Sequence, residues 1–333
     1  MAIRDLISAY TDEYDLSDLH LHADKPLSIR VSGQIASFED DIVTAGDLAS
    51  FIEDCLETEE AISRFGSERE YDLAVIIDNC RYRANLFHTS TGQAAVLRKI
   101  ETEIPTMMDL GLPPVVQDMA NQTNGLVLVT GPTGSGKSTS LAAMIDHINS
   151  TRNEHILTIE DPIEYIHFSK ESVVAQREVG RDTNSFANAL RASLREDPDV
   201  ILVGELRDRE TVQLALTAAE TGHLVFGTLH TSGAPNTINR IIDVFPPEQQ
   251  DQVRSQVSQS LQMVMTQKLL PKVGGGRVGA FEVMVCNSAV RNLIRENKIF
   301  QIESIMQTAR GDGMVTMDAA IQQLKGSGQV ENI

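Results

Sequence analysis

The chain has 333 residues, a length that predicts two domains with a sizeable core. Its formal net charge of −19 argues against nucleic acid as the main ligand, because polyanion-binding proteins usually carry a basic footprint, and against simple electrostatic docking on an anionic membrane. No apolar run approaches the roughly 18 residues that span a bilayer, and three cysteines without CxxC spacing indicate reduced thiols, so we expect neither nucleic-acid binding nor direct membrane insertion.

Residues 1–100 show the patterns of a small α+β domain. Apolar and polar residues alternate over 17–23 and 27–31, which predicts two half-buried strands. Thr44 is a candidate N-cap for a helix, and a second short helix is expected after Thr58. Three further strands are expected at 70–76, 79–88 and 93–100.

The stretch 101–114 interrupts this pattern. Three prolines and a glycine fall close together there, as is typical of a linker. We therefore place the domain boundary in this stretch, expect a second domain over 115–333, and predict that the linker acts as a hinge.

From Gly125 onward, strand and helix patterns alternate, which predicts a doubly wound α/β domain with a mostly parallel sheet and helices on both faces. Ligands of such sheets bind at the carboxyl ends of the strands. Strands are expected at 126–130, 155–159, 199–203, 223–229 and 278–285. Helices are expected at 137–149, 183–196, 208–220, 234–243 and 247–267, followed by a helical C-terminal end over 289–333.

The run GPTGSGKST over 131–139 matches the phosphate-binding loop pattern, and a predicted strand and helix flank it as the motif requires. Its glycines let the backbone curl so that N–H groups point at an anion, and the following helix adds its positive dipole end. Lys137 can reach the β- and γ-phosphates, and Ser138 can place its hydroxyl on Mg²⁺. The candidate nucleotide-binding residues are Gly131, Pro132, Thr133, Gly134, Ser135, Gly136, Lys137, Ser138 and Thr139.

The apolar strand predicted at 199–203 ends near Glu205, in a pattern similar to a Walker B element. Gly204 intervenes where the simplest version of the element has its acid, and Glu205 takes that role. Glu205 could orient the attacking water as general base and support the shell of Mg²⁺. A surface acid at a strand end is the alternative interpretation.

A second acidic cluster, Glu160, Asp161 and Glu164, follows a predicted strand at the same sheet edge. Carboxylates this close repel one another unless they face water or a cation, and hydrated Mg²⁺ is the natural cation. We assign Glu160 and Glu164 to the metal and water network, with a solvated acidic loop as the alternative. His230 follows another strand, where a neutral imidazole could hydrogen bond the γ-phosphate or simply pack at the surface.

Two pairs of residues in the first domain also attract attention. His20 and His22 point the same way on a strand, but no further metal ligand is obvious and a structural role is favoured. Arg83 and Arg98 lie on the strands before the linker. They either stabilise acidic neighbours or supply a cation to a phosphate across a domain or subunit gap.

Together these motifs closely resemble the PilT family of type IV pilus retraction ATPases, within the secretion ATPase superfamily. The resemblance covers nearly the whole chain. It rests on GPTGSGKST at 131–139, TIEDPIEYIH at 158–167, LREDPDVILVGELRDRET at 194–211, TAAETGHLVFGTLHT at 217–231, RIIDVFP at 240–246 and AVRNLIRENKI at 289–299.

The resemblance implies a PAS-like domain over 1–100 joined to a RecA-like ATPase domain, assembled as a homohexamer. It implies hydrolysis of ATP with Mg²⁺, in which Glu205 acts on the water and His230 lies near the γ-phosphate. Arg83 and Arg98 are the matches to arginines that act on a neighbour's nucleotide. It further implies a cytoplasmic motor docked at the inner-membrane face on a pilus platform protein, with a possible PilU-like paralogue as partner.

Residues 289–298 resemble the family's C-terminal element, which retraction needs and nucleotide binding does not. We expect neither the long extra N-terminal domain nor the tetracysteine metal site of pilus assembly ATPases in this protein, and this expectation favours retraction. Four alternatives stay open: a PilU-like accessory retraction ATPase, an ATPase of a related secretion or conjugation system, a RecA-type nucleic-acid motor, and a regulatory module that holds ATP without turnover.

Overall fold

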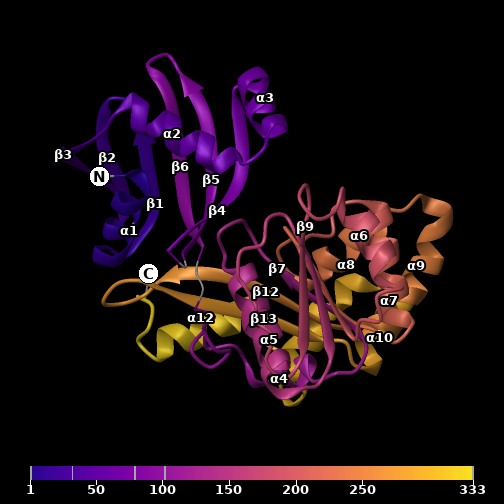
Figure 1. Ribbon diagram of the computed structural model, residues 1–333. Helices are drawn as coiled ribbons and strands as arrows, with labels where there is room; N and C mark the ends of the chain where they lie inside the picture. Colours follow the sequence, from indigo (N-terminus) through magenta and orange to yellow (C-terminus); the bar gives the residue numbers. More distant parts are fainter. Residues whose placement is uncertain (1, 32, 79, 101–102, 332–333) are drawn as a thin grey trace. The chain divides into compact units, whose positions relative to one another are not determined.

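The computed structural model describes residues 2–31, 33–78, 80–100 and 103–331 (Figure 1). Internal contacts divide the chain into two compact units, residues 1–102 and 103–333. The division falls within the predicted linker 101–114, of which Glu101 and Thr102 lie outside the described residues, as do residues 332–333 of the predicted helical end.

Most of the predicted linker is folded chain that belongs to the second unit. Hydrogen-bonded turns occupy residues 107–111, where the N–H of Leu112 donates to the carbonyl oxygen of Met107. Leu112 is buried in the same apolar cluster as Val116 of helix α4 (Pro114–Ala120). That the stretch 101–114 acts as a hinge stays a prediction, and its larger part, residues 103–114, belongs to the second unit.

The first unit is a six-stranded antiparallel sheet in the order β3-β2-β1-β6-β5-β4, with helices packed against it. Each strand predicted in this unit is present, and β3 is an addition. β3 escapes prediction because most of its residues are exposed and it shows no alternation. The elements are α1 (Ile3–Glu13), β1 (Leu16–His22), β2 (Lys25–Val31), β3 (Gln34–Val43), α2 (Ala45–Leu56), α3 (Glu59–Glu68), β4 (Glu70–Ile77), β5 (Cys80–Thr89) and β6 (Gly92–Ile100).

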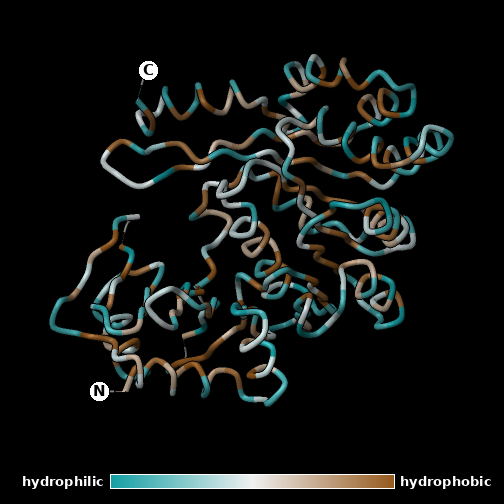
Figure 2. The backbone as a smooth tube through the Cα atoms, turned by 90° about the horizontal axis from the view of Figure 1, so that it is seen from above, coloured by the Kyte–Doolittle hydropathy of each residue, from teal (hydrophilic) through white to brown (hydrophobic). Residues whose placement is uncertain are grey.

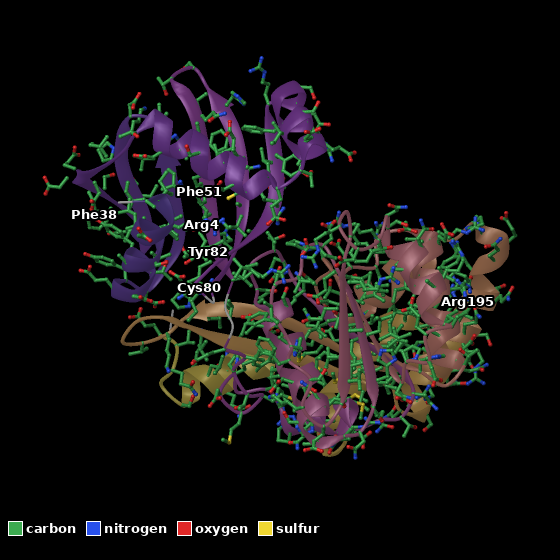
Figure 3. All side chains as sticks on the ribbon, viewed as in Figure 1. Arg4, Phe38, Phe51, Cys80, Tyr82 and Arg195 are labelled. Carbon is green, nitrogen blue, oxygen red and sulfur yellow. The ribbon has the colours of Figure 1, made fainter. Side chains whose placement is uncertain are left out.

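Buried contacts tie the helices of the first unit to its sheet. The Tyr82 hydroxyl on β5 lies 2.7 Å from the Thr11 hydroxyl on α1, and both side chains are buried. The Arg4 guanidinium lies over the Phe51 ring, 5.9 Å from its centroid, so a cation–π contact links α1 to α2 (Figure 3). The unit thus has its own core.

The second unit is built on a seven-stranded sheet in the order β13-β12-β7-β11-β10-β8-β9. All neighbouring pairs are parallel except β12 and β13, so the α/β class predicted from the sequence is confirmed. The elements are α4 (Pro114–Ala120), β7 (Gly125–Thr130), α5 (Lys137–Thr151), β8 (His155–Glu160), β9 (Val173–Glu178), α6 (Phe186–Ser193), β10 (Val200–Val203), α7 (Arg209–Glu220), β11 (Leu224–Leu229), α8 (Ala234–Asp243), α9 (Pro247–Ser260), β12 (Leu261–Pro271), β13 (Arg277–Val285), α10 (Ser288–Arg295), α11 (Ile302–Thr308) and α12 (Met317–Gly326).

Helices cover both faces of this sheet. On β7, Leu126 and Leu128 pack into a cluster with helices α6 to α11, whereas Val127 and Val129 pack into another with α4 and α5. A strand buried on both faces reads as a continuous apolar run. The helices instead alternate between hydrophilic and hydrophobic colour along their turns, as Figure 2 shows.

The helix predicted over 247–267 is wrong in its second half. Helix α9 ends at Ser260, and Leu261 begins β12, a central strand between β7 and β13. Met263 and Met265 of β12 are fully buried opposite Val127 and Val129 of β7. The strand is buried on both faces, so its apolar residues do not alternate and resemble a continuation of the helix.

Two further elements of the second unit have no counterpart among the predictions. Helix α4 begins at Pro114. Proline is favoured at the first helical position, but in this stretch it was interpreted as part of a linker. β9 is an edge strand with partly exposed side chains; Val173 is 64% exposed. Weak patterns of this kind cannot be separated from loops by periodicity.

Two findings bear on the classes considered from composition. Within the described ranges, no helix combines the length and apolar character of a membrane span. Cys55 and Cys286 are buried as free thiols, and burial raises the pKa of each to about 11, so both are protonated near neutral pH.

Candidate nucleotide-binding and hydrolysis site

The loop over 131–136 joins β7 to α5 and has a backbone that depends on glycine. Gly131 has φ +140°, and a Cβ there would lie 2.4 Å from the carbonyl oxygen of Gln267. Gly134 and Gly136 also have positive φ. The loop is therefore wrapped tightly against β12, and its curl leads directly into the N-terminus of α5, as anion binding requires.

Lys137 is 8% exposed and folds back onto the loop. Its ammonium donates to the carbonyl oxygens of Gly131, at 3.0 Å, and Pro132, at 3.1 Å, and lies 3.4 Å from His230 Nδ1. Desolvation lowers the pKa of Lys137, and the charges of Glu205 and Glu164 partly offset this effect. A buried cation held by neutral carbonyls is ready to receive phosphate oxygens.

Gln267 of β12 braces the loop from outside. The side chain is 2% exposed, and its amide nitrogen donates to the carbonyl oxygen of Ser135 across 2.5 Å. Next to Gln267 on β12, the Thr266 hydroxyl lies 2.8 Å from the hydroxyl of Thr130, the last residue of β7. Sequence reasoning missed Gln267, because a polar residue inside an apolar run gave no sign of its target.

Glycine at position 204 explains why the acid follows one residue later than in the simplest Walker B pattern. A Cβ on Gly204 would lie 3.2 Å from the carbonyl oxygen of Ile159 and 3.3 Å from the Cα of Glu160. The backbone at Gly204 is crowded against β8. The next residue, Glu205, is the first whose side chain can point into the cavity beside the phosphate loop, which is described below.

The Glu205 carboxylate lies between the Arg207 guanidinium and the His230 imidazole. Its Oε2 lies 2.6 Å from the Arg207 guanidinium and 3.5 Å from His230 Nε2. Burial alone would raise the pKa of the Glu205 carboxyl, but the hydrogen bond and charge of Arg207, with His230 behind them, outweigh burial and lower it. Glu205 is therefore ionised, and His230 links it to Lys137.

The acidic cluster divides into one half-buried member, Glu160, and two exposed members, Asp161 and Glu164. Glu160 accepts hydrogen bonds from Thr158, at 2.7 Å, and Gln176, at 3.2 Å, and burial raises its pKa to about 7. Glu164 is exposed on the loop after β8. Gln176 of β9, which sequence reasoning missed, also donates to the Tyr165 carbonyl oxygen and accepts the His167 N–H, and so fixes this loop.

A cavity of about 420 Å³ brings most of the predicted residues together. Phe186, Arg207 and Arg277 line it without having been predicted, and the predicted residues Gly131, Pro132 and Ser135 are not part of its lining. The predicted residues in the lining are Thr133, Gly134, Gly136, Lys137, Ser138, Thr139, Glu160, Glu164, Glu205 and His230. Residues from four strand ends thus meet where the parallel sheet predicts a ligand.

The lining suits a magnesium ion that arrives with a nucleotide. Ser138, Glu160 and Glu205 all face the cavity, but no three His, Cys, Asp or Glu side chains among the described residues are arranged to hold a metal by themselves. Mg²⁺ typically keeps several waters and binds through one or two protein ligands plus substrate phosphates. Ser138 is the direct ligand that fits this pattern, and the carboxylates fit water-mediated contacts.

Arg83 and Arg98 belong to the first unit and face each other across β5 and β6. Arg98 donates to Asp18 at 2.8 Å, and Arg83 lies 4.0 Å from Asp72. The Arg98 side chain is 70% exposed, whereas Asp18 is 5% exposed, so Arg98 supplies the counter-charge of a buried carboxylate from the surface. Both arginines therefore present exposed guanidinium groups on one face of the antiparallel sheet.

The motif at 289–299 begins in α10, where Arg291 holds the end of α9. Its guanidinium donates to the carbonyl oxygens of Ser258, at 2.8 Å, and Gln259, at 2.7 Å, and to the Gln262 side chain at 2.9 Å. The last carbonyls of a helix have no partner within the helix. Arg291 thus caps α9 at the point where the chain turns into β12.

Replacing Arg291 with alanine should lower the free energy of unfolding of the second unit by about 2 kcal/mol, since charged hydrogen bonds to otherwise unpaired groups are lost. Urea denaturation followed by circular dichroism measures this loss. Arg295→Ala, at an exposed position on the same helix, is the matched control and should change stability by less than about 0.5 kcal/mol. Equal stability of the two variants would contradict the capping role.

Comparison with known proteins identifies the family. A profile of the type II/IV secretion system proteins matches residues 13–275. The chain is 48% identical over 331 residues to the type IV pilus retraction ATPase PilT of Pseudomonas aeruginosa, covering 99% of this chain and 96% of that protein. It is 56% identical over 263 residues to a twitching motility protein of Neisseria gonorrhoeae, covering 78% of this chain and 70% of the relative.

A solved structure agrees with these relatives. The crystal structure of the pilus retraction motor PilT with bound ADP matches with a TM-score of 0.92 at 48% identity, over 99% of this chain and 94% of that one. The resemblance predicted from the motifs is therefore confirmed over nearly the full length. The chain belongs to the type II/IV secretion system protein family and, within it, to the PilT family of type IV pilus retraction ATPases.

Proposed function

We propose that this chain is a homohexameric motor in which ATP bound in the 420 Å³ cavity is cleaved through Glu205. As a member of the PilT family it is an ATPase that powers type IV pilus retraction and twitching motility. The observation that carries the site assignment is the chain of contacts from Lys137 through His230 to Glu205, because it links the phosphate loop to the candidate base.

The proposed reaction is an in-line displacement by water. ATP places its phosphates in the loop, and Lys137 exchanges the carbonyls of Gly131 and Pro132 for phosphate oxygens. Glu205 orients the water and accepts its proton as the water oxygen bonds to the γ-phosphorus and the bond to the bridging oxygen of ADP breaks. Bound Mg²⁺ would neutralise charge on the β- and γ-phosphates, with Ser138 as its protein ligand and Glu160 reached through water.

Phosphate release by the purified chain tests this proposal and separates it from two alternatives. Turnover should require Mg²⁺, be lost on addition of EDTA, and not rise with single-stranded DNA, because a net charge of −19 disfavours binding of a polyanion. Binding of ATP without any phosphate release would favour a regulatory module. Stimulation by DNA would favour a nucleic-acid motor.

Arg83 and Arg98 are proposed to complete the charge clamp on the nucleotide of a neighbouring subunit. Replacing either with alanine should lower kcat by at least about 10-fold, because a cation at the transferring phosphoryl group is lost. Co-expression of Arg98→Ala with Lys137→Ala tests the arrangement in trans. Mixed rings should exceed the mean activity of the two variants, because one subunit supplies the arginine and the other the binding site; activity at or below that mean contradicts action between subunits.

We also propose partners and a location that follow from the motor role. The ring would dock on a pilus platform protein at the cytoplasmic face of the inner membrane. Hydrolysis would change the angle between the two units of each chain, and this rigid-body motion would act on the platform protein. A PilU-like paralogue is a possible partner, and a PilU-like role is the second candidate. The 289–298 segment, which resembles the retraction element, favours the first.

A further inference from the structure

The segment that carries Arg207 has a fixed backbone. The N–H of Leu206 donates to the Thr228 carbonyl oxygen across 3.0 Å, and the Leu206 side chain is 4% exposed in the core. Asp208 caps helix α7 by accepting the Thr211 N–H at 2.9 Å. Arg207 is therefore a long side chain that extends from an anchored position between a buried residue and a helix cap.

Only the side chain of Arg207 can move readily. It is 70% exposed, lines the cavity, and lies 2.6 Å from Glu205 Oε2. From Glu205 the contacts continue through His230 Nε2, at 3.5 Å, and from His230 Nδ1 to Lys137, at 3.4 Å. The guanidinium thus lies at the far end of a short row of polar and charged side chains that begins with Lys137 at the phosphate loop.

This ion pair conflicts with the role of Glu205. A carboxylate held by a guanidinium is a weaker base and has one oxygen less for the attacking water. ATP brings several negative charges into the same cavity, and guanidinium groups match phosphate oxygens bidentately. The ion pair therefore fits the protein without nucleotide. When ATP is bound, its phosphate oxygens compete with the Glu205 carboxylate for the Arg207 guanidinium.

We infer that Arg207 exchanges Glu205 for the γ-phosphate when ATP binds, and that it is a catalytic residue supplied by the same subunit. Without nucleotide, Arg207 is paired with the Glu205 carboxylate. In the ATP complex Arg207 binds the γ-phosphate and neutralises charge on the phosphoryl group, and the Glu205 carboxylate is then free to contact the attacking water. The inference rests on the proposed role of Glu205. It adds a cation in cis to the arginines proposed to act between subunits.

Arg207→Ala tests the inference through the difference between two nucleotides. The variant should bind a nonhydrolysable ATP analogue about 10-fold more weakly and ADP with unchanged affinity, because only ATP carries the γ-phosphate. Its kcat should fall at least about 10-fold, and Arg207→Lys should restore part of it. Equal losses for the analogue and ADP, or an unchanged kcat, would overturn the inference.

Two comparisons make the result specific. Arg209→Ala removes an exposed arginine two residues away that does not line the cavity, and it should match the wild type in both affinities and in kcat. An active Arg207→Ala chain beside an inactive Glu205→Gln chain would overturn the role of Arg207 and leave the proposed function standing. A wild-type chain that releases no phosphate would overturn both.

Discussion

Replacing Glu205 with glutamine should leave ATP bound and lower kcat by about 100- to 1000-fold, as expected when a positioned general base is removed. Glutamine preserves the shape of the side chain and can still orient a water, but it cannot accept a proton. The affinity for ATP should not fall, because the phosphates contact the loop and Lys137, and the variant no longer has the carboxylate that competes for Arg207. Steady-state phosphate release and the Kd of a fluorescent ATP analogue measure the two quantities separately.

The control for this variant is Glu210→Gln. Glu210 lies on α7 close to Glu205 in sequence, is exposed, and pairs with Arg191 outside the cavity. Its loss should leave kcat within about twofold of the wild type. A Glu205→Gln chain that retains wild-type kcat would remove Glu205 from the chemistry, and one that no longer binds ATP would make it part of the binding site instead.

Replacing Gly131 with alanine should lower the free energy of unfolding of the second unit by about 2–4 kcal/mol and weaken ATP binding at least about 100-fold. The added Cβ would lie 2.4 Å from the carbonyl oxygen of Gln267 and 2.8 Å from the Ser135 hydroxyl, and φ is +140°. Backbone atoms of β12 cannot yield as a flexible side chain can, so the loop must move away from the strand and lose its curl.

Gly134→Ala separates crowding from backbone strain. Gly134 also has positive φ, at +74°, but a Cβ there would meet nothing within 4 Å. This variant should cost only about 1 kcal/mol, the price of a left-handed alanine. Denaturation of both variants without nucleotide gives the comparison. Equal stability of the two alanine variants would show that close packing of the loop against β12 is not the reason for glycine at position 131.

Much of the site could be predicted because its chemistry lies in short stretches of sequence. The phosphate loop is nine consecutive residues, and strand–loop–helix patterns place it at the edge of a parallel sheet. Glu160 ends a strand that the apolar pattern reveals, and Glu205 and His230 each follow one. The carboxyl ends of parallel strands meet at one edge, so their convergence follows from topology.

The remaining residues depend on contacts between distant parts of the chain. Gln267 touches Ser135 only because β12 lies beside β7, and β12 is the strand that the helical pattern hides. Gln176 reaches the loop after β8 from an edge strand with no clear alternation. Arg207 follows Glu205 in the sequence, but its pairing with that carboxylate requires the geometry of the turn between β10 and α7.

The central claim is that hydrolysis through Glu205 drives pilus retraction, and the most direct measurement is the number and retraction of surface pili on cells whose only copy of this chain carries Glu205→Gln. We predict cells with abundant pili that do not retract and with no twitching, because ATP binds but the motor cannot turn over. Cells without pili would assign the chain to assembly, and normal retraction would show that Glu205 does not trigger the power stroke.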